Sequence, residues 1–416
     1  MIAPRALRLQ VPTLMIVAAS IGAIRAPSRL ASRAPGNAAT QWSQVSAGAY
    51  GNCALDAVGK AFCWGADFGR ESGGTVFNRT PKPVPTPIRF STVTVGGSMA
   101  CGLSVDGPMY CWGSAIESSL GDGLTRVSSA PVRVSMPGVV TQISAGAPRV
   151  CGLDAVGTVH CWGEGLKAFR PDSNEFFVVR PSPVRSNVRF QQVSVGSTQV
   201  CAVDVSDDAY CWGYGYGSIG IGARDTSCMS SSGCIDVDHP QRVVGDLKWS
   251  QVSAGNGFTC GVTRDARGYC WGDVLSADDP YGSSGTLGRG ELKGSPAPVA
   301  VTGGLRFIAI HAGTRHACGL TTDSVAVCWG INSTGQLGIG RADAGVYRPG
   351  GRGRYPSPQR VLGGLQFTSV AVGENSCGIT IGRELFCWGD NSRGMLGTGR
   401  GGAHETAPAR VTEPGR

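Results

Sequence analysis

Cysteine is the residue type whose number and spacing in this chain point most clearly to chemistry. Seven times a Cys is followed ten residues later by a second Cys, and the second is always followed by Trp and Gly. The seven pairs are Cys53 with Cys63, Cys101 with Cys111, Cys151 with Cys161, Cys201 with Cys211, Cys260 with Cys270, Cys318 with Cys328, and Cys377 with Cys387. Thiols at such a spacing could form disulfides, stay reduced as small buried groups, or bind zinc.

The regular pairing favours disulfides over the other two possibilities. Zinc ligands of one pair usually lie roughly two to four residues apart, which is closer than the spacing here. Both cysteines are present in all seven repeats and none lacks its partner. We therefore expect one disulfide within each repeat, with free core thiols and a metal site as the alternatives.

The two remaining cysteines, Cys228 and Cys234, lie within one repeat in a segment of small and polar residues. A local disulfide between them would fix a long surface loop. The total of sixteen cysteines is even, as expected for the disulfide framework of an exported protein.

The other residue types that often carry chemistry form no recognisable catalytic motif. The chain has five histidines, which are His160, His239, His311, His316 and His404. His160 and His316 occupy repeat positions that packing residues usually fill, so we expect both to be structural. Asp236 and Asp238 could contribute to a calcium site, although a single Asp-x-Asp is usually solvated. We therefore assign no catalytic, cofactor-binding or metal-binding residue and expect no cofactor.

The elements that position the cysteines recur with a period near fifty residues. Successive first cysteines lie 48, 50, 50, 59, 58 and 59 residues apart. The sixth repeat shows the pattern: a Pro-containing segment (297–301), a strand ending in Ala-Gly (307–313), and two strands that carry the cysteines (317–320 and 325–330). Four short strands in such a repeat are typical of a β-propeller blade, so the sequence predicts an all-β fold.

A tight turn between the two cysteine strands supports a hairpin. Asp56 and Gly59 are the first and fourth residues of a segment midway between Cys53 and Cys63, which suits a type I turn. The third repeat has the same Asp and Gly, whereas the last three repeats lack Gly at this position. In such a hairpin the two cysteines lie opposite each other, close enough for a disulfide.

Three motifs give the repeat a family resemblance. They are His316–Leu320, Cys328–Asn332 and Gly335–Gly338 in the sixth repeat, and the last recurs in weaker form in four other repeats. The unit resembles the repeat of the regulator of chromosome condensation family, over about residues 41–412. The resemblance implies a seven-bladed β-propeller of four-stranded blades, and the cysteine pairs favour an exported, Cys-rich bacterial branch. It implies little about function, because propellers serve many roles.

The two ends of the repeat array predict how the ring closes. The first repeat begins at Gln41 without a Pro-containing segment, and one such segment, Ala407–Val411, follows the last repeat. We infer that this C-terminal strand completes the blade begun at Trp42 and so closes the ring. The repeated Trp is expected to pack between blades, and the Gly after it to relieve the backbone.

The N-terminus indicates export. Arg5 and Arg8 precede an apolar run from Val11 to Ile24, followed by small residues, as in a signal peptide. The run is short for a membrane span, so no stable membrane anchor is expected. An uncleaved anchor and a mis-assigned start of the chain are the alternatives. We assign residues 1–34 to a signal peptide and short leader, and residues 41–412 to one propeller. The protein would then be secreted, periplasmic or at the cell surface.

Export also changes the charge argument. The formal net charge is +8, and removing the five arginines of residues 1–34 leaves +3. No stripe of Lys and Arg interleaved with aromatics remains, so we expect no nucleic-acid partner.

The function must be argued from the scaffold. The loops after the Cys-Trp-Gly strands vary most in length, and variable loops on a rigid scaffold usually serve recognition. Our leading hypothesis is an exported, disulfide-stapled monomer that binds another protein or a cell-surface polymer and is not an enzyme. The alternatives are a lyase or glycan hydrolase that uses the central funnel, and an intracellular exchange factor or chromatin-binding regulator.

Overall fold

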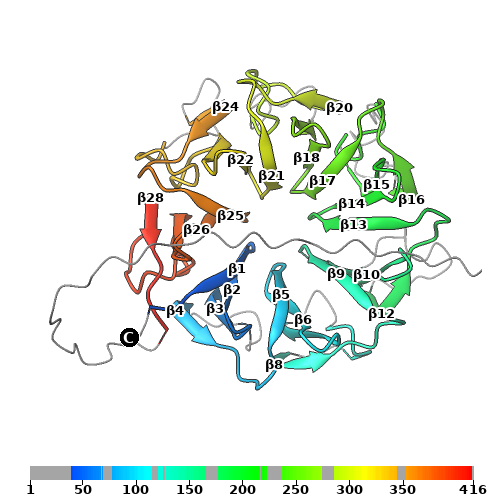
Figure 1. Cartoon of the computed structure of the whole chain (residues 1–416), viewed down its shortest axis with the longest axis horizontal. Helices are drawn as coiled ribbons and strands as arrows, with labels where there is room; N and C mark the ends of the chain where they lie inside the picture. Colours follow the sequence, from blue (N-terminus) through cyan, green and yellow to red (C-terminus); the bar gives the residue numbers. More distant parts are fainter. Residues whose placement is uncertain are drawn as a thin grey trace, which may run out of the picture. The chain divides into compact units, whose positions relative to one another are not determined.

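The protein is a ring of seven four-stranded antiparallel sheets in this computed structural model (Figure 1). The structure describes residues 39–66, 68, 77–114, 120–124, 127–147, 149–164, 177–215, 217–222, 236–273, 285–343 and 353–414. These residues contain strands, turns and bends but no helix, so none of them forms a helix that could span a membrane. The predicted fold class, a seven-bladed propeller, is confirmed.

Each blade consists of four consecutive strands, which follow one another in order from the ring centre to its rim. The inner strands are β1 (Trp42–Ala47), β5 (Phe90–Val95), β9 (Val140–Ala145), β13 (Phe190–Val195), β17 (Trp249–Ala254), β21 (Phe307–Ala312) and β25 (Phe367–Val372). The second strands are β2 (Gly51–Asp56), β6 (Met99–Ser104), β10 (Arg149–Asp154), β14 (Gln199–Asp204), β18 (Phe258–Thr263), β22 (His316–Thr321) and β26 (Asn375–Thr380).

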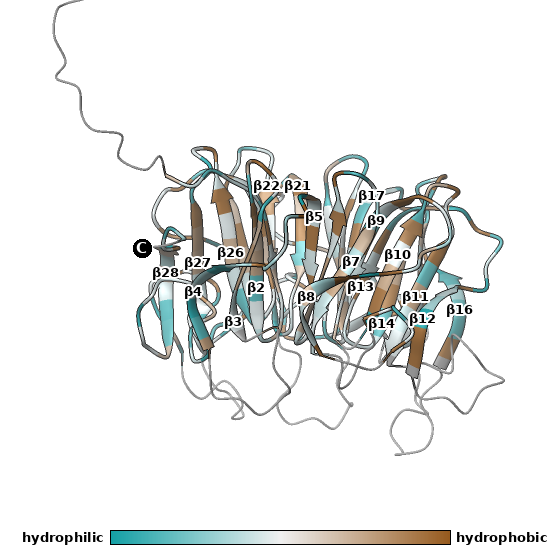
Figure 2. Ribbon diagram, turned by 90° about the horizontal axis from the view of Figure 1, so that it is seen from below, coloured by the Kyte–Doolittle hydropathy of each residue, from teal (hydrophilic) through white to brown (hydrophobic). Residues whose placement is uncertain are grey.

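The two remaining strands of each blade complete the sheet toward the rim. The third strands are β3 (Ala61–Ala66), β7 (Met109–Gly113), β11 (Val159–Glu164), β15 (Ala209–Tyr214), β19 (Gly268–Gly272), β23 (Ala326–Ile331) and β27 (Leu385–Asp390). The outer strands are β4 (Phe77–Pro83), β8 (Ser128–Arg133), β12 (Phe177–Pro183), β16 (Asp236–Arg242), β20 (Ser295–Ala300), β24 (Arg354–Arg360) and β28 (His404–Arg410). Hydrophilic residues predominate on outer strands such as β4 and β16 (Figure 2).

The predicted ring closure is wrong, because the repeat boundary lies one strand later than expected. The Pro-containing segment is the last, outer strand of a blade and follows the two cysteine strands of that blade. β28 therefore pairs with β27 in the seventh blade, and Ala409 lies opposite Cys387. Proline suits this position because an outer strand leaves one edge unpaired. The ring closes instead where β1 packs beside β25 and β26, with the Trp42 N–H donating to the Arg383 carbonyl at 3.0 Å.

The second and third strands of each blade form the hairpin that carries the predicted disulfide. In every blade the two cysteines are directly opposite each other, and the pair is bonded, with Cα atoms 4.0–4.1 Å apart. The seven bonds join Cys53 to Cys63, Cys101 to Cys111, Cys151 to Cys161, Cys201 to Cys211, Cys260 to Cys270, Cys318 to Cys328, and Cys377 to Cys387.

These cystines lie in the core of the blades. Every one of the fourteen cysteines is at least 93% buried, because none is more than 7% exposed. The alternatives of free core thiols and of a metal site therefore do not describe these pairs, since each sulfur is bonded to its partner. The predicted bridge between Cys228 and Cys234 lies outside the described residues.

The repeated Trp-Gly pair does what the sequence predicts. All seven tryptophans of the pair are at most 2% exposed. The Trp64 indole of the first blade donates to the Met395 carbonyl of the seventh at 2.8 Å, so the ring bridges two blades. The glycine that follows always has a positive φ, from 89° at Gly65 to 117° at Gly113, a conformation that other residues adopt only with strain.

Candidate functional site

The chain direction gives the disc two different faces (Figure 2). Loops that leave the inner and third strands emerge on one face, which we call the loop face. The hairpin turns between second and third strands lie on the other, which we call the turn face. Consecutive antiparallel strands impose this division, so the long loops predicted to share one side of the disc all start from the loop face.

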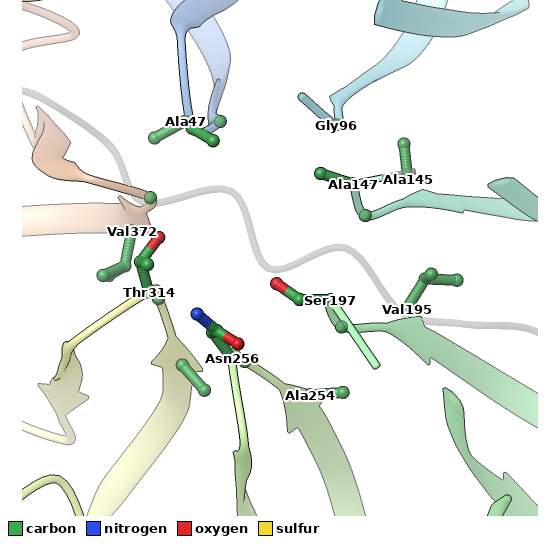
Figure 3. A pocket seen from close by; sticks show the side chains of 18 of the residues that line it. Ala47, Gly96, Ala145, Ala147, Val195, Ser197, Ala254, Asn256, Thr314 and Val372 are labelled. Atoms are coloured by element: carbon green, nitrogen blue, oxygen red, sulfur yellow. The ribbon is translucent and has the colours of Figure 1, made fainter. Parts of the chain in front are cut away.

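Seven glycines surround the channel mouth at the loop face, one at the end of each inner strand. This glycine collar consists of Gly48, Gly96, Gly146, Gly196, Gly255, Gly313 and Gly373. A Cβ atom on any of them would lie 2.3–2.7 Å from the carbonyl oxygen of the next glycine around the ring. The close approach of seven blades therefore excludes any side chain here, and the collar encloses a space of about 100 Å³ (Figure 3).

The residue after each collar glycine makes the mouth two-sided, with small residues along one part of its rim and polar residues along the other. Blades one to three place Ala49, Gly97 and Ala147 there, whereas blades four to seven place Ser197, Asn256, Thr314 and Glu374. Figure 3 shows the Ser197, Asn256 and Thr314 side chains gathered on one side, opposite Ala147. Their N–H groups donate to collar carbonyls of the next blade, as from Asn256 to Gly313 at 3.1 Å. Hydrogen bonding thus fixes these tips around the mouth.

An aromatic and cationic pair adjoins the collar where the first and seventh blades meet. Tyr50 is 42% exposed, and the Arg393 guanidinium lies 4.6 Å from the centre of its ring. Glu374 is nearby in the same blade as Arg393, and its burial raises the pKa of its carboxyl group, although Arg315 and Arg393 oppose this rise. Tyr and Arg are enriched among residues that dominate protein interfaces.

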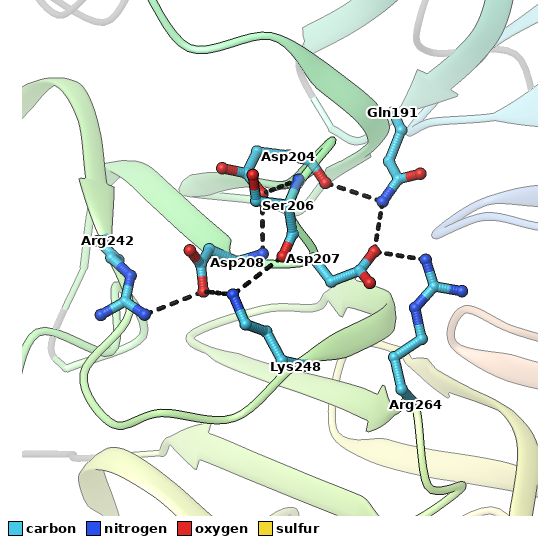
Figure 4. Close-up of polar contacts among 8 residues, drawn as sticks. All are labelled: Gln191, Asp204, Ser206, Asp207, Asp208, Arg242, Lys248 and Arg264. Carbon is cyan, nitrogen blue, oxygen red and sulfur yellow. Dashed lines mark hydrogen bonds and ion pairs between the residues drawn. The ribbon is translucent and has the colours of Figure 1, made fainter.

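The turn face carries an ion-pair network between the fourth and fifth blades (Figure 4). Asp208 accepts from Arg242 and Lys248 at 2.9 Å each, and Asp207 accepts from Arg264. Burial alone would raise the pKa of Asp208, but the two cations outweigh it and lower this pKa. These side chains satisfy one another across the blade boundary, which is a structural role, and exposed pairs of this kind add little stability.

Two of the histidines are structural, as predicted. His160 is buried and its Nε2 lies 3.0 Å from a carboxylate oxygen of Asp154 in the same hairpin. His316 is 1% exposed, with its Nε2 2.7 Å from the Ser376 hydroxyl of the next blade. Burial lowers the pKa of His316 to about 3, so this imidazole is neutral at neutral pH.

The other three histidines lie apart from one another. His311 faces the axial channel, and burial lowers its pKa to about 4. His239 lies on outer strand β16 with its Nδ1 2.5 Å from Asp238, and both side chains are more than half exposed. His404 is exposed on β28. The structure therefore assembles no catalytic group of histidines and acids from these five residues.

The acidic pair that could have held calcium lies on a strand rather than in a loop. Asp236 and Asp238 are both in β16, where Asp238 contacts His239. Within the described ranges, no group of three or more His, Cys, Asp or Glu residues is arranged to hold a metal ion.

Sequence reasoning identified the scaffold but not the two-sided mouth. The signal was present, because the residue after each Ala-Gly or Val-Gly changes from small to polar between the third and fourth repeats. Its meaning depends on these seven positions meeting at one axis, which only the closed ring shows. The contact between Tyr50 and Arg393 joins residues far apart in sequence and left no such signal.

Comparison with known proteins agrees with the repeat and the fold. Residues 307–336 match the regulator of chromosome condensation (RCC1) repeat. The chain is 31% identical to the probable E3 ubiquitin-protein ligase HERC6 of Homo sapiens over 170 residues, which are 39% of this chain and 15% of that protein. It is 29% identical to the ultraviolet-B receptor UVR8 of Arabidopsis thaliana over 150 residues, 35% of this chain and 30% of the receptor. The chain thus matches less than a third of the length of either relative.

A solved structure shares the architecture over most of the chain. Prp20p from Saccharomyces cerevisiae superposes with a TM-score of 0.65 at 18% identity, covering 80% of each chain. At this identity the likeness concerns the fold. Residues 307–336 thus match an RCC1 repeat, and the seven four-stranded blades resemble the fold of the Prp20p structure.

Proposed function

We propose that this protein is an exported, disulfide-stapled propeller that binds another protein or a cell-surface polymer through its loop face. The observation that carries the proposal is the two-sided collar mouth with Tyr50 and Arg393 beside it. Its tips are held by backbone hydrogen bonds, so the surface is preorganised and loses little entropy on binding.

The disulfides support the export part of the proposal. All seven hairpin cystines are buried in the blades, and disulfides persist in oxidising compartments such as the bacterial periplasm or the extracellular space. A reducing cytosol would leave fourteen thiols in the core, in hairpins whose paired cysteines already lie opposite one another. The signal-like residues 1–34 agree with the same compartment.

The binding part draws on the fold family as well as the site. The Prp20p structure was described together with the binding of that protein to Gsp1p and histones, so a propeller of this architecture can bind proteins. No residue of this chain carries those partners over, and the mildly basic mature domain does not favour nucleic acid. We propose Tyr50, Arg393, Asn256, Thr314 and Glu374 as the contact residues, and a monomer as the binding unit.

Site-specific photocrosslinking tests which face binds. A photocrosslinking amino acid replaces exposed Asn256 on the loop face or, as a matched control, exposed Asp106 on the turn face, in protein exported by the producing cells. We expect adducts of discrete mass from position 256 alone, and a reduced yield when Tyr50→Ala is added but not when Val58→Ala is added. Equal adducts from both positions, or adducts from position 106 alone, would contradict a loop-face binder.

A further inference from the structure

The inner strands expose one backbone edge, and most blades cover the edge of their neighbour with two side chains. A Gln and a Ser or Thr two residues later accept hydrogen bonds from alternate N–H groups of the next inner strand. Gln192 accepts from Val252 at 2.9 Å, and Ser194 accepts from Ala254 at 2.9 Å. The same capping pair recurs as Gln44 with Ser46, Gln142 with Ser144, and Gln251 with Ser253.

The second blade keeps half of the pair, because it has Thr92 in place of Gln while Thr94 accepts from the Ala145 N–H at 3.0 Å. The sixth and seventh blades lack both members of the pair. The sixth has Ala309 and His311 at these positions, and the seventh has Ser369 and Ala371. The register of β25 against β26 matches that of the capped strands, so the N–H groups of Val370 and Val372 point toward the sixth blade. Neither has a partner among the described side chains, because alanine offers no acceptor and His311 makes no hydrogen bond to them.

The boundary between the seventh and first blades also lacks the capping pair. The β1 strand has the register of its capped counterparts, so the N–H groups of Val45 and Ala47 face the seventh blade. Ser369 is too short to replace glutamine there, and its buried hydroxyl makes no hydrogen bond within the described structure. The uncapped positions therefore follow one another around this part of the ring.

The axial channel holds a space of about 370 Å³ that borders these uncapped edges and also β5 and β9 of the second and third blades. Its wall includes Val370, Val372, Val45, Ala47 and His311, and the rest of the lining consists of neutral residues with no carboxylate. A volume of this size accommodates a small organic molecule. Unpaired N–H groups beside such a space favour a ligand that brings hydrogen-bond acceptors.

The spacing of the free donors specifies the ligand further. Alternate N–H groups of an extended strand lie about 6–7 Å apart, since each residue advances the strand by about 3.3 Å. A single phosphate or acetate is too small to reach both, whereas the two carboxylates of a four- or five-carbon diacid span about this distance. Oxygens of such a diacid would stand where Gln Oε1 and Ser Oγ stand in the capped blades.

We propose that the axial channel binds a small dicarboxylate at the boundary of the sixth and seventh blades. Its two carboxylates accept from the N–H groups of Val370 and Val372, and the neutral imidazole of His311 donates a further hydrogen bond. The mature propeller keeps a positive formal charge after loss of residues 1–34, which favours an anionic ligand. This site lies inside the ring and is separate from the proposed loop-face contact.

Titration of the purified protein with glutarate tests the proposal, with acetate and phosphate as comparison probes. The His311 ring signal is followed by ¹⁵N NMR, and affinity is measured by calorimetry. We expect a saturable His311 shift with glutarate and a much weaker one with acetate or phosphate. No saturable shift with glutarate, or equal affinity for acetate, would overturn the proposal.

Two variants complete the test and keep His311 as the reporter. Ala309→Gln installs the missing cap on the Val370 N–H and should weaken glutarate binding about tenfold, the effect of losing one charge-assisted hydrogen bond. His239→Gln, on exposed outer strand β16, should leave the affinity unchanged. Unaltered glutarate binding in Ala309→Gln would contradict the assignment of the ligand to this edge. Folding of both variants is checked by their melting temperatures.

Discussion

The channel wall has two sectors that share a backbone but differ in their side chains. The inner strands of the fourth, fifth and sixth blades, which we call the closed sector, have their outward N–H groups capped by the Gln and Ser of the preceding blade. The inner strands of the seventh and first blades, which we call the open sector, lack these caps, and they line the axial cavity together with β5 and β9. Two side chains per blade thus decide whether the N–H groups of a strand edge are capped, while the register stays the same.

The buried contacts behind the inner strands differ in the same way. At the boundary of the fifth and sixth blades, Phe258 packs in an apolar cluster with Ala317. At the open boundary of the sixth and seventh, the equivalent residue is His316, which contacts Ser376. The boundary of the sixth and seventh blades therefore carries a titratable group where the boundary of the fifth and sixth carries hydrocarbon.

The largest expected effect is acid destabilisation through His316. Its pKa is about 3 in the fold against an ordinary value near 6.5, so only the unfolded chain takes up this proton as the pH falls through that interval. Stability should fall by about 1.4 kcal/mol per pH unit below about pH 6.5. Thermal unfolding at pH 7 and pH 4.5 measures this loss.

Two replacements isolate the histidine contribution. His316→Phe introduces the residue type of the equivalent Phe258 in the fifth blade and should remove this part of the pH dependence. His239→Gln on the exposed outer strand should keep the pH dependence. The same pH dependence in His316→Phe and the parent would show that this buried group does not titrate as the structure requires.

A smaller effect contrasts one substitution in each sector. Gln251→Ala removes an acceptor for the Ile310 N–H and a donor to the Ile310 carbonyl, and should lower the free energy of unfolding by about 1–3 kcal/mol. Ser369→Ala removes a hydroxyl that makes no hydrogen bond within the described structure and should leave stability nearly unchanged. Chemical denaturation of both variants measures the difference, and equal losses would remove the distinction between the sectors.

The smallest effect should be a gain in stability. Ala309→Gln supplies the open sector with the residue that caps the other blades, and the new hydrogen bonds to the β25 edge should add about 1 kcal/mol. Chemical denaturation without any added diacid measures this gain. A clear loss of stability would mean that the space beside Ala309 cannot hold a capping side chain.

The sequence predicted those parts of the fold that are set within one repeat. The spacing of ten residues placed Cys53 opposite Cys63 because a two-stranded hairpin fixes which residues face each other. The Trp-Gly pair was equally local, since the positive φ of Gly65 follows from the backbone beside it. The predicted blade boundary was wrong because a Pro-containing strand has the same sequence pattern whether it begins one blade or ends another.

The parts of the site that arise between blades were not predictable in this way. Gln44 and Ser46 recur visibly as Gln-x-Ser in other repeats, but their role appears only when the facing N–H groups of Val93 and Val95 are placed. The Tyr50 and Arg393 contact depends on the first and seventh blades meeting at ring closure. The repeat period predicts the single blade, whereas the contacts between blades arise only when the ring closes.

We propose that the protein is an exported propeller stapled by disulfides, and intact mass with thiol alkylation tests both parts of this proposal. Alkylation must be done in denaturant, because the paired cysteines are buried and would not react in the folded protein even as thiols. We expect a chain shortened at its N-terminus, with no labelled cysteine before reduction and sixteen after it. A full-length chain that labels at many cysteines without reduction would contradict both export and the disulfide staples.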